Sequence, residues 1–148
     1  MSDEFDRVEA LQASPLFANM LPLEKQYLAD LAVRRDLRAG EMLFDLGSIG
    51  EAVYIVVSGA LRVLVPSKGG EMTVVATLSA PDFLGEMALI DRQPRAARVE
   101  AVEETVLLAV SHDNIYSFAK VYRNGFTWLV VNIAKGLSAR LRAMNKNL

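Results

Sequence analysis

The chain contains no cysteine, one histidine and no long apolar run, and each absence excludes a class of protein. Without cysteine there is no disulfide, zinc–cysteine site or iron–sulfur cluster. The single histidine, His112, falls short of the several ligands that metal sites and β-roll metalloenzymes need. We therefore expect no metal and interpret His112 as a surface residue that begins a helix. No segment approaches the roughly 20 apolar residues that span a bilayer, and the acidic N-terminus lacks the apolar core of a secretory signal. These two absences predict a cytoplasmic protein without a membrane partner.

The sequence also lacks a large excess of either positive or negative side chains. The 148 residues include 16 Lys and Arg against 18 Asp and Glu, a net charge of −2, which argues against a nucleic-acid-binding surface. The apolar fraction of 52% is that of a globular protein, and the length predicts one domain spanning residues 1–148. No Ser-His-Asp or Cys-His set can be assembled from the sequence, so we expect that the protein is not an enzyme.

Glycine-rich turns divide residues 35–110 into short segments of β-forming residues. The predicted strands are Glu41–Phe44, Ala52–Val57, Leu61–Val65, Met72–Leu78, Ala96–Val102 and Thr105–Val110. Several short strands at this spacing predict a mainly β protein of the α+β class, built on an antiparallel sandwich, barrel or jelly roll.

Helical patterns flank the β region on both sides. Residues 1–34 predict N-terminal helices, of which the second begins at Pro22 and runs to about Val33. In residues 111–148, Ser111 is a candidate cap for a third helix.

The C-terminal helical region is expected to be broken once. Residues 123–125 (Arg-Asn-Gly) interrupt the pattern, and a final helix is predicted from Phe126 almost to the end. Along it apolar residues recur every three or four positions, which predicts one continuous apolar stripe that includes Val130, Leu141 and Met144.

The most informative segment is 83–99, which reads FLGEMALIDRQPRAARV. Gly85 lets the backbone approach a ligand, and a helical turn that opens at Glu86 aims unpaired N–H groups at an anion. Arg95 supplies a charged fork that matches phosphate oxygens, and a carboxylate accepts hydrogen bonds from sugar hydroxyls. A plain ion pair between Glu86 and Arg95 is the simpler alternative. The small residues Ala96 and Ala97 beside the arginine favour a ligand site instead.

This segment resembles the phosphate-binding cassette of the cyclic nucleotide-binding domain. That family includes bacterial catabolite-activator regulators, regulatory subunits of cyclic-AMP-dependent protein kinase and nucleotide-gated channels. The positions that fit its pattern are Phe83, Gly85, Glu86, Met87, Ala88, Leu89, Pro94, Arg95, Ala96, Ala97 and Val99. The resemblance implies an antiparallel β-roll flanked by N-terminal helices and two C-terminal helices.

The resemblance also implies a ligand and its contacts. Arg95 and the amides around Glu86 and Ala96 would hold the phosphate of a cyclic nucleotide, and Glu86 would accept from the ribose 2′-OH. Guanosine-preferring relatives tend to carry threonine directly after the arginine, so Ala96 favours cyclic AMP over cyclic GMP. Val75 and Leu78 match the positions on which the purine rests, with a plain core role as the alternative.

The last helix carries two further expectations. As in the catabolite-activator relatives, it can pair with a second copy and place Asn145 near the adenine, whose edge suits an amide; a plain core helix is the alternative. The chain ends at Leu148, where those relatives begin a helix-turn-helix. We therefore expect no DNA-binding domain, a swing of the last helix about residues 123–125, and a signal to an effector protein in trans.

Arg98 departs from the family pattern, which has Thr or Ser at this position in kinase-type members. A strand-face arginine directed at solvent is one interpretation. A second cation near the phosphate, or a site altered for another small anion, are the others. Arg98 also supports a second functional class, a family member that binds no nucleotide and serves as a protein-interaction module.

Overall fold

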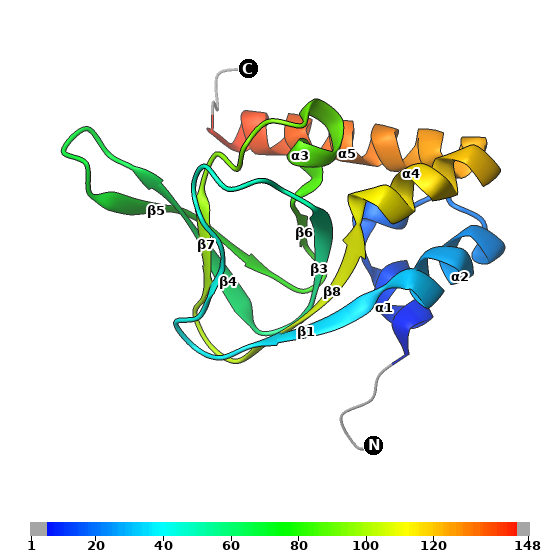
Figure 1. Ribbon diagram of the computed structural model, residues 1–148, viewed down its shortest axis with the longest axis horizontal. Coiled ribbons are helices and arrows are strands. Elements are labelled where there is room, and N and C mark those ends of the chain that lie inside the picture. The colour runs from blue at the N-terminus through cyan, green and yellow to red at the C-terminus, as the bar shows by residue number, and fades with distance from the viewer. Residues whose placement is uncertain (1–5, 145–148) are drawn as a thin grey trace.

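The computed structural model describes residues 6–144 and contains two four-stranded antiparallel sheets (Figure 1). One sheet has the strand order β1-β8-β3-β6 and the other β2-β7-β4-β5. The strands are β1 (Val33–Leu37), β2 (Met42–Phe44), β3 (Ala52–Ser58), β4 (Ala60–Pro66), β5 (Met72–Ser79), β6 (Phe83–Leu84), β7 (Arg98–Ala101) and β8 (Thr105–Ser111). The hairpin of β4 and β5 projects away from the helices (Figure 1).

Helices from both ends of the described chain, together with one short helix from its middle, gather on one side of this roll (Figure 1). They are α1 (Arg7–Ala13), η1 (Pro15–Phe17), α2 (Pro22–Leu31), α3 (Glu86–Asp91), α4 (His112–Val121) and α5 (Arg123–Met144). The expected β-roll flanked by N-terminal and C-terminal helices is therefore confirmed. Within residues 6–144 no helix combines the length and apolarity needed to cross a bilayer.

Side-chain caps fix where the helices begin. Asp6 accepts hydrogen bonds from two backbone N–H groups of the first turn of α1. The carboxylate of Glu24 accepts from the backbone N–H of Leu21 at 2.8 Å and closes the start of α2. Ser111 accepts from the N–H of Asn114 at 3.1 Å, so the predicted cap of α4 is confirmed. Each cap satisfies an N–H that the helix itself leaves unpaired.

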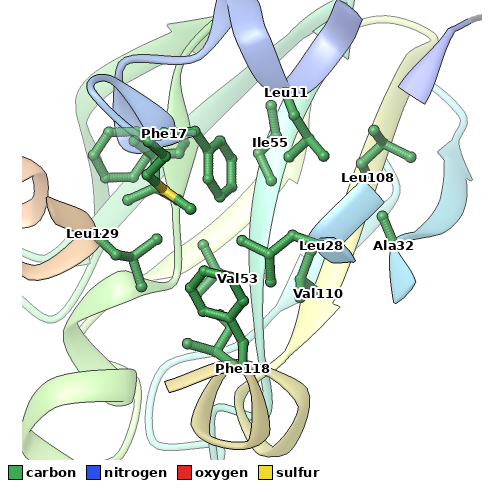
Figure 2. Close-up of a cluster of buried hydrophobic side chains, with 14 of the residues drawn as sticks. Leu11, Phe17, Leu28, Ala32, Val53, Ile55, Leu108, Val110, Phe118 and Leu129 are labelled. Carbon is green, nitrogen blue, oxygen red and sulfur yellow. The ribbon is translucent and has the colours of Figure 1, made fainter. Parts of the chain in front are cut away.

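The side chains of β3 point alternately into two apolar clusters. Val53 and Ile55 face the helices, where they meet a cluster drawn in part in Figure 2. Tyr54 and Val56 face the interior of the roll and pack in the second cluster. Because successive side chains of a strand point to opposite faces, one strand anchors the helices and also lines the roll.

The N-terminal helical region ends earlier than the sequence predicted. The sequence placed helix up to about Val33, but α2 ends at Leu31 and β1 begins at Val33. Val33 pairs with Ala109 in β8, so sheet pairing decides its conformation. Strand β6 was also missed, because its two residues, Phe83 and Leu84, are recognisable only from their pairing with β3.

The C-terminal helices also differ from prediction. Only Tyr122 separates α4 from α5, and Gly125, expected in a break, is buried within α5. The apolar stripe packs on the body of the domain only over the inner part of the helix, so a plain core helix does not describe its outer part. Leu129 and Ile133 are buried, but Leu141 and Met144 are 58% and 83% exposed. The outer third of α5 extends past the core that its inner part covers.

Candidate functional site

A cavity of about 290 Å³ opens between the roll, α3 and the outer part of α5. Its walls come from β2, β4, β5, the segment from β6 to β7, and α5. The lining residues are Phe44, Val63, Ala76, Leu78, Leu84, Gly85, Glu86, Met87, Ala88, Asp91, Gln93, Pro94, Arg95, Ala96, Ala97, Val99 and Arg140. All of the predicted site residues except Val75 and Asn145 are among them.

Val75 and Asn145 have different outcomes. Val75 is 56% exposed on β5 and does not line the cavity, whereas Ala76 and Leu78 do. The register between β4 and β5 shifts at this point, because Val63 pairs with Ala76 but the next residue pairs with Val74. Val75 is therefore the extra residue of a bulge, and alternation places Ala76 and Leu78 on the cavity face. Asn145 lies outside the described residues.

Arg95 is the buried cation of the cavity. The residue is 8% exposed, its Nη2 donates to the carbonyl of Ala52 at 3.2 Å, and its Cζ lies 4.0 Å from the centre of the Phe44 ring. Its Nε is buried and has no hydrogen-bond partner among residues 6–144. Burial lowers the pKa of the guanidinium from its ordinary value, while Tyr54 and Glu86 act in the opposite direction. An anion placed against Arg95 would satisfy the unpaired donor and offset the burial.

Backbone contacts with the preceding loop position Arg95. Its N–H donates to the carbonyl of Ser48 at 2.7 Å, and its carbonyl accepts from the N–H of Gly47 at 2.8 Å. At Gly50 a Cβ would lie 2.7 Å from both Cζ of Arg95 and Cβ of Ala88. The glycine-rich run that the sequence showed as turn punctuation is thus also the space into which the arginine side chain fits.

Gly85 begins the short helix α3 in a left-handed conformation with φ of 86°. A Cβ there would lie 2.6 Å from the carbonyl oxygen of Ala52 and 3.0 Å from Nη1 of Arg95. The position therefore requires glycine for both its conformation and its close approach. Because α3 has six residues, its N-terminus is a weak source of positive potential, and Arg95 is the cation buried beside it.

Glu86 is 2% exposed and pairs with Arg140 of α5, whose Nη1 lies 3.0 Å from Oε2. The Nη2 of Arg140 also donates to the carbonyl of Phe83 at 3.3 Å. The alternative of an ion pair between Glu86 and Arg95 is therefore wrong, because the carboxylate is directed at α5. Arg140, although it comes from the distant helix α5, lines the cavity.

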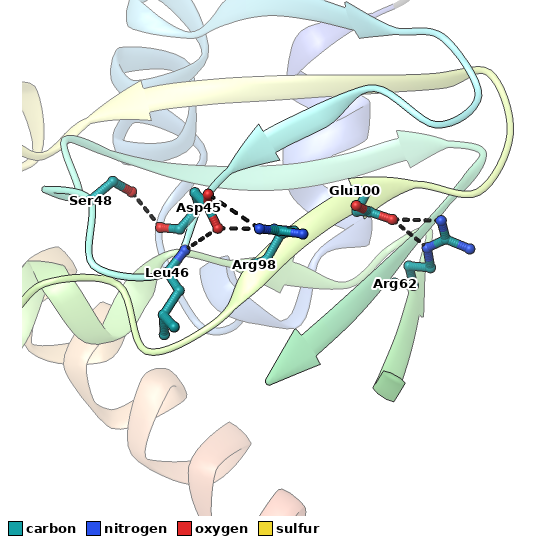
Figure 3. A network of polar contacts seen from close by, with 6 residues as sticks. All are labelled: Asp45, Leu46, Ser48, Arg62, Arg98 and Glu100. Carbon is teal, nitrogen blue, oxygen red and sulfur yellow. Dashed lines mark hydrogen bonds and ion pairs between the residues drawn. The ribbon is translucent and has the colours of Figure 1, made fainter. Parts of the chain in front are cut away.

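Arg98 is not among the residues that line the cavity. It pairs with Asp45, as Figure 3 shows. Its Nε donates to Asp45 at 2.9 Å. This hydrogen bond lowers the pKa of Asp45 and raises the pKa of Arg98 from their ordinary values. The placement agrees with the interpretation of Arg98 as a strand-face arginine and leaves no second cation from it beside Arg95.

His112 is buried, at 8% exposure, contrary to the surface position expected for it. Its Nε2 lies 3.3 Å from the carbonyl of Gly85, so α4 contacts the start of the cassette from behind. Burial lowers the pKa of the imidazole, which keeps it neutral near pH 7. Within residues 6–144 no group of three or more metal-ligating side chains gathers around it or elsewhere.

The sequence missed several lining residues because they come from separate elements. Phe44 and Val63 belong to strands that were predicted, but nothing local indicates which face of each strand meets Arg95. Arg140 is 54 positions from Glu86 along the chain. Asp91 and Gln93 lie within the cassette segment 83–99. Their position in the sequence could therefore have predicted that they lie near the cavity.

The β-roll, the short inserted helix α3 and the buried Arg95 thus enclose one cavity. The profile of the family described as "Cyclic nucleotide-binding domain" matches residues 34–122, more than half of the chain. The chain belongs to this family.

Named relatives and solved structures support the same family. The chain is 31% identical over 93% of its length to the "Cyclic AMP receptor protein" of Thermus thermophilus, of which it spans 62%. The crystal structure of the Thermus thermophilus catabolite activator protein superposes with a TM-score of 0.78 at 31% identity, over 90% of this chain and 61% of that one. The regulatory domain of Toxoplasma gondii PKA, crystallised with cyclic AMP, gives a TM-score of 0.72 at 28% identity, over 78% of this chain and 46% of that one.

Proposed function

We propose that this chain is a sensor of a cyclic nucleotide, with cyclic AMP preferred, and that it acts by binding and not by catalysis. The observation that carries the proposal is the buried Arg95, whose Nε has no protein partner in the described chain and which lines a cavity. A buried cation with an unpaired donor is costly unless an anion completes it. The phosphodiester of a cyclic nucleotide carries one such negative charge.

The rest of the ligand fits the remaining lining. Glu86 would accept a hydrogen bond from the ribose 2′-OH while it keeps its contact with Arg140. Leu78, Ala76 and Val63 offer apolar side chains on which the purine rests. The cavity lies at the small end of the range for small-molecule sites, roughly 300–1,000 Å³. Ala96 carries no hydroxyl for a guanine amino group, which favours adenine.

The movement of α5 would be confined to its outer part. The amide of Asn132 donates to the carbonyls of Leu16 and Ala18, each at 2.9 Å, and is itself buried. These bonds hold the inner part of α5 to the N-terminal helices. Between Ile133 and Met144, Arg140 forms the hydrogen bonds that join α5 to the body of the domain within the described residues. We therefore place the pivot beyond Ile133 and not at residues 123–125.

A nucleotide that engages Glu86 would change the helix position through Arg140. Coupling of this kind requires the ligand to favour one helix position over the other. A charged hydrogen bond contributes about 1.5–3 kcal/mol, whereas moving a population from 1:99 to 99:1 requires roughly 5.5 kcal/mol. Contacts of the outer helix with the base must supply the difference. The exposed Leu141 and Met144 would then present a changed surface to a second copy or to an effector protein.

Calorimetric titration of the purified chain with cyclic AMP and cyclic GMP tests the binding. We expect cyclic AMP to bind with a Kd in the micromolar range or tighter, roughly −8 kcal/mol or better, and cyclic GMP to bind more weakly. No heat from either nucleotide with a folded sample would overturn the proposal and favour a protein-interaction module. Tighter binding of another small anion would retain the site and replace its ligand.

Spin-label distances test the movement, and the absence of native cysteine makes the labelling clean. One variant pairs Gln26→Cys on α2 with Ser138→Cys on the outer part of α5; its control pairs Gln26→Cys with Thr127→Cys on the inner part. We expect cyclic AMP to shift the first distance and leave the second unchanged. A shift in both would restore the pivot at 123–125, and a shift in neither would exclude a moving helix.

A further inference from the structure

Phe44, at the end of β2, contacts the arginine on which the proposed function depends. Its ring is half-buried, lines the cavity and lies 4.0 Å from Cζ of Arg95. On its other side the ring packs near Tyr54, with ring centres 6.3 Å apart. Nothing in the sequence pattern linked Phe44 to the cassette, which begins 39 positions later along the chain at Phe83.

A guanidinium as buried as Arg95 needs compensation for the water that it has lost. The near carboxylate, Glu86, is paired with Arg140. The recorded partners of Arg95 itself are the carbonyl of Ala52 and the face of Phe44, both uncharged. A cation over an aromatic face gains the most when it is desolvated, as it is here.

We propose that Phe44 is the positioning residue of Arg95: its ring holds the buried guanidinium in the orientation that receives the ligand phosphate. The effect of Phe44 on ligand affinity rests on the proposed function, whereas its contact with Arg95 does not. A carboxylate in the same place would neutralise the arginine and compete with the phosphate for its N–H groups. An aromatic face contacts Cζ, so the guanidinium keeps its charge and the Nε donor stays unpaired.

Gly50 completes the same arrangement. A Cβ at that position would approach Cζ and Nε of Arg95 to 2.7 and 2.9 Å. The stack of Arg95 on Phe44 is therefore possible only because the facing backbone carries no side chain. This accounts for a lining aromatic residue and a glycine that the contacts with the ligand alone do not explain.

The test uses Phe44→Leu, which removes the ring and keeps an apolar side chain, and Phe44→Tyr, which keeps the ring. Tyr27→Leu is the matched control, because it removes a half-buried ring that packs against Phe118 and Tyr122 in the core cluster beneath the helices. In nucleotide-free protein, NMR of arginine side chains follows the Nε–H of Arg95, assigned by its loss in Arg95→Lys. Calorimetry then measures the Kd for cyclic AMP in each variant.

We expect the Nε–H signal of Arg95 to move in Phe44→Leu through loss of the ring current, and to stay near its wild-type position in Phe44→Tyr and Tyr27→Leu. The Kd for cyclic AMP should rise about tenfold to thirtyfold in Phe44→Leu, as a desolvated cation–π contact implies, and recover in Phe44→Tyr.

An unmoved signal in Phe44→Leu would overturn the inference, and a raised Kd with that unmoved signal would mean that the ring touches the ligand directly. Wild-type affinity in Phe44→Leu would also overturn it. If the wild-type protein binds no cyclic nucleotide, the proposed function fails, while the NMR signal still decides whether the ring of Phe44 lies against Arg95 in solution.

Discussion

Replacing Arg95 with alanine is expected to raise the Kd for cyclic AMP at least about a hundredfold. Each hydrogen bond between a charged group and its partner contributes about 1.5–3 kcal/mol, and two such bonds from the guanidinium to the phosphate make roughly 3–6 kcal/mol. About 1.4 kcal/mol corresponds to a factor of ten in affinity. The loss of these two hydrogen bonds therefore raises the Kd a hundredfold or more. Calorimetric titration under the conditions used for the wild-type protein measures it.

Arg98→Ala is the matched control. Arg98 lies three positions along the same segment, carries the same charge, pairs with Asp45 and does not line the cavity. We expect its Kd to stay within about threefold of the wild-type value, since an exposed ion pair is worth roughly 0–1 kcal/mol. Equal losses in Arg95→Ala and Arg98→Ala would show that general positive charge, and not the buried fork, attracts the nucleotide.

Thermal unfolding separates a lost contact from a lost fold. The guanidinium of Arg95 is buried with one unpaired nitrogen, so its removal takes away an unsatisfied donor as well as the stack on Phe44. We expect the ligand-free Arg95→Ala protein to unfold near the wild-type temperature. A large drop in that temperature would mean that Arg95 serves the fold first, and the weaker binding would then say nothing about the site.

The local parts of the site could be predicted from the sequence. Gly85, Glu86 and Arg95 lie within one segment, and the left-handed conformation of Gly85 is a local property that glycine favours. The fold class was predictable for a similar reason, because turns and alternating strands are written in consecutive residues. The resemblance to a family then selected one β architecture among several.

Contacts between distant segments could not be predicted. Phe44 and Arg140 reach the cavity because β2 and α5 end beside it, and that proximity depends on the packing of the whole roll. Val75 was misplaced by one residue because a bulge in β5 is invisible without its partner strand. A shift of one residue in a strand exchanges its two faces. The errors therefore concern which face of an element meets the ligand more often than which elements exist.

The two buried charges of the site, Arg95 and Glu86, have different kinds of partner. Arg95 is held by uncharged groups, and Glu86 is held by Arg140 from the helix proposed to move. In the proposed function, Arg95 is thus left available for the ligand, while Glu86 would link the ligand to α5. Removing water from both makes their interactions stronger and also makes an unmatched ligand more costly to accept.

The substitution Gly125→Ala is expected to destabilise the fold by about 2 kcal/mol, although alanine is the better helix former by roughly 1 kcal/mol. A Cβ at this position would lie 2.6 Å from Oε2 of Glu24, 2.7 Å from its Cδ and 2.8 Å from Cζ of Phe118. Both neighbours are buried, and the carboxylate of Glu24 also caps α2 through the N–H of Leu21. Relief of the clash would therefore disturb either the cap or the aromatic core. Urea unfolding of the ligand-free protein measures the change.

Gly136→Ala is the control for Gly125→Ala, because it makes the same substitution in the same helix. There a Cβ would approach Cζ of Phe83 only to 3.3 Å, so the gain in helix propensity offsets a mild contact. We expect its free energy of unfolding to stay within about 1 kcal/mol of wild type. A marked loss at Gly136 with little change at Gly125 would reverse the assignment of the rigid and movable parts of α5. The inner part of the helix would then be the loosely held one, and the pivot would return to residues 123–125.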